Sequence, residues 1–182
     1  TFRIETVLEH IEIPWSIVFD HEGNMYFTER PGRLQVLRKG QSKPILIAEL
    51  KEVAHRGEGG LMGLALHPKF SSNKFVYLSY TTSLKGDLSN KVVRFKIEDN
   101  SLSGGVVVIP RLPGSSVHNG CRLRFGPDAK LYVTAGDAAD REIAQDKKSL
   151  GGKILRLNDN GSIPSDNPDP KSAIYAVGVR NP

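Results

Sequence analysis

A histidine and an aspartate in the second half of the chain have the residue types and the placement of a general-base pair. His118 precedes a predicted strand that begins near Leu123, and Asp137 ends the next predicted strand, which is centred on Tyr132. Because neighbouring antiparallel strands return to the same end of a sheet, the two side chains are expected within hydrogen-bond reach. An aspartate that accepts from one ring nitrogen holds the tautomer and makes the other nitrogen a better base. The alternative is a turn histidine beside a strand-capping aspartate.

Two further segments carry groups suited to a ligand. The glycine-rich stretch Arg56–Gly60 would let the backbone and Glu58 approach a ligand closely, although such turns also precede ordinary strands. Near the C-terminus, Arg180 could hold an anion through a bidentate contact, and Asn181 could add a directional amide. From composition alone an arginine without such a role is the simpler interpretation. His67, next to a proline, is interpreted as structural.

An internal repeat indicates which elements position these residues. In three segments an alternating strand leads through a turn to a strand centred on a tyrosine, and these tyrosines are Tyr26, Tyr77 and Tyr132, separated by 51 and 55 positions. Another alternating strand follows each of them. A fourth unit is expected to begin at Ile174–Val177. Turn-forming residues between the strands, as in Gly126-Pro127-Asp128, favour hairpins.

Repeats of this length, built from several short antiparallel strands, predict an all-β fold, a β-propeller of four-stranded blades. The alternative is a β-sandwich with coincidental spacing. A repeat of about 53 residues places about three and a half blades in a single partial domain over residues 1–182, whereas propellers close with about four to eight blades. The remaining blades are therefore expected outside this chain, in a longer polypeptide or in a complementary chain that closes the circle.

Composition excludes several classes of protein. The 182 residues carry 25 Lys+Arg against 20 Asp+Glu, a net charge of +5 that is spread along the chain rather than concentrated in a nucleic-acid-binding surface. The longest aliphatic run, residues 106–109, is far too short to span a membrane. A single cysteine excludes an intramolecular disulfide and a cysteine-based zinc site, and no metal-ligand set is predicted within the chain.

Collinear motifs along nearly the whole chain resemble the soluble PQQ-dependent aldose sugar dehydrogenase / glucose dehydrogenase family. The resemblance covers about the first half of a family member. Its matching strings include Pro14-Trp15-Ser16-Ile17, Thr28-Glu29-Arg30-Pro31-Gly32-Arg33, His118-Asn119-Gly120-Cys121-Arg122-Leu123, Gly152-Lys153-Ile154-Leu155-Arg156 and Gly178-Val179-Arg180-Asn181-Pro182.

The resemblance implies about half of a six-bladed propeller with pyrroloquinoline quinone (PQQ) across the channel mouth. It implies that His118 takes the proton of the sugar's anomeric hydroxyl while hydride passes to the quinone, giving a lactone. Asp137 would hold the histidine, and Arg180 and Asn181 would contact the cofactor. Glu58 stands near the sugar pocket, where many members carry glutamine, so sugar specificity is expected to differ.

The same resemblance implies calcium bound by residues of the missing half, an aldose substrate, an external electron acceptor and a periplasmic or extracellular location. Cys121 occupies a position that is usually glycine, and we expect it to tighten packing. Two other functions stay open: a non-catalytic propeller-type binding module, or a fragment that is inactive alone. A six-bladed lactonase would need more metal-binding carboxylates around the channel.

Overall fold

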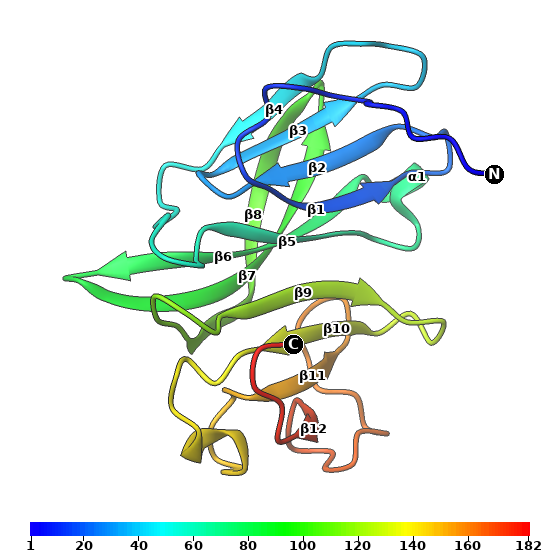
Figure 1. Cartoon of the computed structure of the whole chain (residues 1–182). Coiled ribbons are helices and arrows are strands. Elements are labelled where there is room, and N and C mark those ends of the chain that lie inside the picture. The colour runs from blue at the N-terminus through cyan, green and yellow to red at the C-terminus, as the bar shows by residue number, and fades with distance from the viewer.

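The computed structural model describes residues 1–182 as three antiparallel sheets of four strands with very little helix (Figure 1). The first sheet contains β1 (Pro14–Phe19), β2 (Met25–Glu29), β3 (Arg33–Leu37) and β4 (Ile45–Glu49). The second contains β5 (Leu61–Leu66), β6 (Phe75–Leu84), β7 (Asp87–Glu98) and β8 (Ser101–Pro113). The third contains β9 (Gly120–Phe125), β10 (Leu131–Ala135), β11 (Lys153–Leu157) and β12 (Ile174–Val177). The predicted all-β fold with four-stranded units is confirmed.

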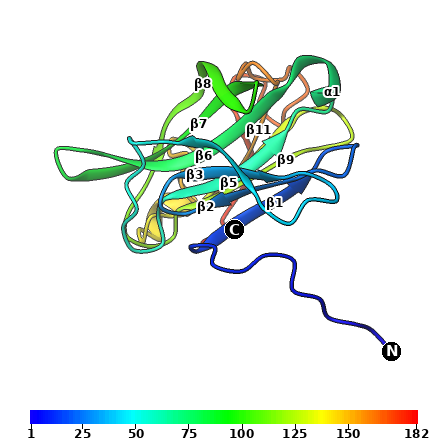
Figure 2. The same ribbon diagram turned by 90° about the horizontal axis from the view of Figure 1, so that it is seen from above.

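Helical structure is limited to two short elements, α1 (Phe70–Asn73) and the 3₁₀ turn η1 (Glu142–Ala144). Neither is long enough to cross a bilayer, and no other helix is present. The β6–β7 hairpin extends past the other strands, and the N-terminal segment leads away from the sheets (Figures 1 and 2).

The strands form where apolar residues alternate, because successive side chains of a strand point to opposite faces. In β10, Leu131, Val133 and Ala135 are fully buried in the core between the second and third sheets, whereas Tyr132 points to the other face. The turn before β10 is held by Asp128, whose Oδ1 accepts the backbone N–H of residue 130 at 3.1 Å. Local sequence thus specifies both the strand and the turn that leads into it.

The first strands of the sheets lie together, since β5 packs against β1 on one side and β9 on the other. Two hydrophobic clusters fill the spaces between neighbouring sheets. On β6, Val76 and Leu78 belong to the cluster shared with the first sheet, and Tyr77 belongs to the cluster shared with the third. The second sheet is therefore covered on both faces, and each outer sheet is covered on one.

The repeat tyrosines share one orientation, although their surroundings differ. Tyr26 is buried in the cluster between the first and second sheets, and Tyr77 is buried in the cluster between the second and third. Tyr132 lies on the uncovered face of the third sheet, where its ring meets that of Tyr175 edge-on at 5.5 Å between centroids. Each tyrosine thus points away from the preceding sheet, as a repeating unit requires.

One expected element is wrong. Ile174–Val177 does not begin a fourth unit, because it is the fourth strand of the third sheet and pairs with β11. The long connection before it folds back around Asn167, whose Nδ2 donates to the carbonyl oxygens of Arg156 and Ser172. This brings the chain to the free edge of β11. An alternating pattern indicates a strand but not the sheet that the strand joins.

Candidate active site

The candidate site lies where the first strands of the second and third sheets begin. His118 ends the connection from β8 to β9, and Asp137 follows β10, which pairs with β9 through Ala135 and Gly120. His118 Nδ1 lies 2.8 Å from Asp137 Oδ1, so the structure brings the two side chains together as expected. His118 Nε2 makes no hydrogen bond within the chain. A carboxylate at Nδ1 favours the tautomer with the proton on Nδ1, which leaves a lone pair on Nε2.

Asp137 is held firmly from three sides. Its side chain is only 3% exposed, and Oδ1 also accepts the backbone N–H of Ala139 at 2.9 Å. The backbone N–H of Asp137 donates to the carbonyl oxygen of Arg180 at 2.8 Å, and the backbone N–H of Ala138 donates to that of His118 at 3.1 Å. The carboxylate therefore has little freedom to leave the histidine.

His118 has a left-handed backbone, with φ of 56°, and its position depends on a close approach by Gly136. A Cβ atom on Gly136 would stand 1.8 Å from the carbonyl oxygen of His118, so only glycine fits there. Backbone strain of this kind persists where the surroundings impose it, and it concentrates at functional sites. The backbone N–H of His118 donates to Glu58 Oε2 at 2.8 Å.

Glu58 comes from the loop between β4 and β5, which lies against the histidine loop. Its backbone N–H donates to the carbonyl oxygen of Ser116 at 2.7 Å, and a Cβ on Gly57 would meet that same oxygen at 2.1 Å. Arg30 donates to the carbonyl oxygens of Gly57 and Gly59 from the other side. The glycines of this stretch thus permit backbone contact, while Oε1 of Glu58 makes no hydrogen bond within the chain.

The two C-terminal candidates lie at the same place, with different partners. Asn181 Oδ1 accepts the backbone N–H of Gly120 at 2.9 Å, and its Nδ2 donates to Glu58 Oε2 at 3.4 Å. The Arg180 side chain is exposed and forms no ion pair. Figure 1 shows the C-terminus beside β9 and β10. Backbone or side-chain hydrogen bonds therefore join all five candidates: Glu58, His118, Asp137, Arg180 and Asn181.

A buried amide network supports the two loops, and none of the sequence motifs marks its residues as part of the site. Asn90 donates through Nδ2 to Asn119 Oδ1 at 3.0 Å and accepts through Oδ1 from Thr81 Oγ1 at 2.7 Å. Thr81 Oγ1 in turn accepts the backbone N–H of Gly60 at 3.2 Å. The network thus runs from the glutamate loop to the residue after His118. An asparagine at an inward position of an alternating strand was the available sequence signal.

Cys121, close to the site, is unsuited to nucleophilic chemistry. Its side chain is fully buried, and burial raises the pKa of the thiol to about 12. A thiolate is the reactive form of cysteine, so this residue stays protonated and inert at neutral pH. Its φ of 70° is left-handed, which accords with a position where related sequences were expected to carry glycine.

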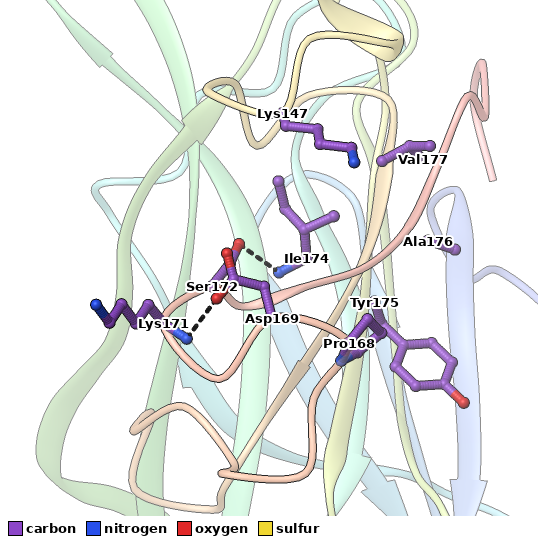
Figure 3. Close-up of a pocket in the computed structure, with 9 residues that line it drawn as sticks. All are labelled: Lys147, Pro168, Asp169, Lys171, Ser172, Ile174, Tyr175, Ala176 and Val177. Atoms are coloured by element: carbon purple, nitrogen blue, oxygen red, sulfur yellow. Dashed lines mark hydrogen bonds between the residues drawn. The ribbon is translucent and has the colours of Figure 1, made fainter.

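A hollow of about 540 Å³ in the surface lies away from these residues (Figure 3). It is formed at the outer edge of the third sheet by β12 and the connection before it, including Ile174 and Tyr175, with Lys147 from the loop between η1 and β11. None of the predicted site residues lines it. No group of three or more His, Cys, Asp or Glu side chains is placed to hold a metal ion.

Comparison with known proteins yields consistent matches. The family model described as Glucose / Sorbosone dehydrogenase matches residues 11–182. The chain superposes on the PQQ-bound aldose sugar dehydrogenase of Streptomyces coelicolor with a TM-score of 0.91 and 33% identity, covering 98% of this chain and 54% of that one. For a putative oxidoreductase (glucose dehydrogenase) of Thermus thermophilus the TM-score is 0.90 and the identity 42%, over 99% of this chain and 56% of that one.

A curated relative gives the same result from sequence. Aldose sugar dehydrogenase YliI of Escherichia coli is 30% identical over 194 residues, which cover all of this chain and 52% of the relative. The chain thus spans about half the length of the proteins it matches.

Proposed function

This chain belongs to the glucose/sorbosone dehydrogenase family, and from that premise we propose that it supplies the general base and part of the cofactor contacts of a PQQ-dependent aldose dehydrogenase. The observation that carries the proposal is the 2.8 Å contact between His118 Nδ1 and Asp137 Oδ1, together with a free Nε2. A non-catalytic module of the same fold would need neither a buried carboxylate at Nδ1 nor an uncommitted Nε2.

In the proposed reaction, His118 Nε2 accepts the proton of the anomeric hydroxyl of the sugar. Asp137 stabilises the imidazolium that forms, since its carboxylate stays hydrogen bonded to Nδ1 throughout. The chemistry that PQQ supplies when bound is acceptance of the hydride from the anomeric carbon, so the aldose becomes its lactone and two electrons leave with the hydride. An external electron acceptor then takes those two electrons.

The residues of this chain fit an anionic, planar cofactor. Arg180 presents an exposed guanidinium with no internal ion pair, and PQQ carries carboxylates and quinone oxygens that such a group can bind. Asn181 fits a different role, since its amide already bridges Gly120 and Glu58. We propose that Arg180 contacts the cofactor directly and that Asn181 contributes mainly by fixing the loop beside it.

Glu58 is proposed to bind the sugar through Oε1, because Oε2 already accepts from His118 and Asn181. Glu58→Gln replaces a carboxylate acceptor by a neutral amide of the same size. We expect it to change KM for aldoses about tenfold and to alter their order of preference, with a smaller effect on kcat. Steady-state kinetics with a panel of aldoses measures this. An unchanged KM for every aldose would remove Glu58 from the substrate site.

The rest of the active site is proposed to come from further sheets. The uncovered face of the third sheet exposes Tyr175, and that of the first exposes Ile17 and Phe19, which is typical of surfaces that another sheet covers. We propose that these sheets complete a six-bladed propeller and provide the calcium ligands, either in the same polypeptide or in a complementary chain. We further propose a periplasmic or extracellular location for the whole protein.

The test uses the full native polypeptide that carries this sequence, loaded with PQQ and calcium. Dye reduction is followed with glucose and other aldoses, for the native protein and for His118→Ala. We expect turnover of at least one aldose and its loss in the variant. PQQ binding without any dye reduction would favour the binding-module alternative. Full turnover by residues 1–182 alone would contradict the proposal that other sheets complete the site.

A further inference from the structure

A buried lysine lies behind the site and is not explained by the proposed chemistry. Lys153, the first residue of β11, is fully buried. Its Nζ donates to three backbone carbonyl oxygens, those of Ile143 at 2.7 Å, Ala144 at 2.9 Å and Gly151 at 2.7 Å. An ammonium group has three N–H donors, so every donor is used. No carboxylate forms an ion pair with it, and burial lowers the pKa of the amine.

The three carbonyls belong to the two ends of one loop, and that loop is joined to the site by the backbone. The Ala144 oxygen also accepts the N–H of Gly178 at 2.9 Å, two residues before Arg180. The N–H of Gly152 donates to the oxygen of Gly136 at 2.9 Å, one residue before Asp137. The ammonium therefore lies at the junction of the segments that carry Asp137 and Arg180.

Those segments are also bonded to each other. The N–H of Asp137 donates to the oxygen of Arg180 at 2.8 Å, and the N–H of Val179 donates to that of Gly152 at 3.2 Å. Lys153 itself is the β-ladder partner of Ala135, at the end of the strand that leads to Asp137. A shift of the loop would thus be transmitted to the carboxylate and to the exposed arginine together.

We propose that Lys153 is a positioning residue, whose ammonium group holds three backbone carbonyl oxygens together. It fixes the 142–152 loop so that Asp137 stays against His118 and Arg180 stays beside Asp137. The catalytic consequence rests on the proposed function, whereas the effect on the backbone does not. Removing the ammonium leaves three buried carbonyl oxygens without donors, and such groups draw in water or move apart.

The first measurement is amide hydrogen exchange in the cofactor-free full-length protein. In Lys153→Ala we expect the amides of Asp137, Gly152, Gly178 and Val179 to exchange about tenfold faster or more, with little change in β5 and β6. Lys153→Met, which keeps most of the side-chain volume, separates loss of the charge from loss of packing. Lys148→Ala is the matched control, because Lys148 lies exposed in the same loop.

The second measurement is chemical rescue. Propylammonium replaces the part of the side chain that Lys153→Ala removes, so it should restore slow exchange in that variant and have no effect on Lys153→Met. The dissociation constant of PQQ, followed by fluorescence, should rise about tenfold in both variants and recover with propylammonium only in Lys153→Ala.

Unchanged exchange at these amides in both variants, or a uniform increase across all three sheets, would overturn the proposal. So would local loosening that leaves PQQ affinity unchanged in a protein that oxidises aldoses. If the native protein oxidises no aldose, the proposed function fails, and the exchange and rescue experiments still decide the positioning role.

Discussion

The molecule contains two histidine–aspartate pairs, one at each end of the sheets, and they differ in which ring nitrogens are engaged. In the pair at the candidate site, His118 uses only Nδ1, at 2.8 Å from Asp137. In the pair at the opposite end, His67 Nε2 lies 3.4 Å from Asp159 Oδ2, while Nδ1 accepts the backbone N–H of Lys69 at 2.9 Å and contacts Asn73. A general base needs a nitrogen that is free to meet substrate, so only His118 qualifies.

The surroundings of the two rings reinforce the difference. His67 is stacked on Tyr77 and meets Phe75 and Phe125 edge-on, between the second and third sheets. Asp159 lies in the turn after β11 of the third sheet, so this pair ties two sheets together, and both ring nitrogens of His67 already have partners within the chain. The structural interpretation of His67 is supported by these contacts. The same two residue types thus form a structural contact between sheets at one end and a proposed general base at the other. The hydrogen-bond donors around each ring determine which of the two roles it has.

The strongest test of this difference replaces each histidine by glutamine in the complete, cofactor-loaded protein. We expect His118→Gln to lower kcat by about 10²–10⁴-fold, the usual contribution of a general base. His67→Gln should keep kcat within about twofold of the native value, because the ring touches no proposed reactant. Dye-reduction kinetics measures both. Equal losses in the two variants would remove the functional distinction between the pairs.

A second test changes the acids. In Asp137→Asn the amide oxygen can still accept from Ala139 and from His118 Nδ1, but the negative charge that stabilises the imidazolium is lost. We expect kcat to fall about 100-fold and its pH dependence to shift, while PQQ affinity stays close to native. Asp159→Asn is the control and should leave kcat unchanged. A pH–rate profile of Asp137→Asn that overlays the native one would contradict the assigned role of Asp137.

A third test concerns stability against pH. Burial lowers the pKa of His67 below its ordinary value of 6.5, opposed by Asp159, with Lys69 and Arg94 also disfavouring the charged ring. The unfolded chain therefore binds a proton below pH 6.5 that the folded chain resists, so the free energy of unfolding falls as the pH drops. His67→Gln should reduce the slope of the free energy of unfolding against pH in this range, by at most the slope that one bound proton produces. Urea unfolding between pH 5 and 7.5 measures the slope, and an unchanged slope in the variant would rule out His67 as its source.

The smallest effect is expected at Cys121, which has a left-handed backbone and lies close to His118. Cys121→Gly relieves backbone strain of about 1 kcal/mol and loses burial of a small apolar side chain worth about 1 kcal/mol. The two terms nearly cancel, so the midpoint of thermal unfolding should move by only a few degrees, with kcat unchanged. Thermal denaturation and dye reduction check this. A large loss of stability would show that the thiol packs better than its size suggests.

Local patterns in the chain were enough to predict the strands, the turns and their repetition. Alternation places residues such as Leu131 and Val133 on one face whatever the partner sheet is, and the residues around Asp128 form their turn through contacts within a few positions. The motifs were also sufficient to mark His118, Asp137, Glu58, Arg180 and Asn181 as candidates. These features depend on short-range geometry, which neighbouring residues control directly.

Contacts between residues far apart in the chain determined the features that the sequence did not predict. β12 completes the third sheet because a buried asparagine folds the preceding connection back. No periodicity in the sequence predicts this. Which histidine nitrogen stays free depends on donors from residues far away in the chain or across a turn, and the role of Lys153 depends on three carbonyl groups that meet only in the folded state. Hydrogen bonds between backbone atoms far apart in the chain do not require a recognisable order of residue types. They are therefore found only in the folded structure.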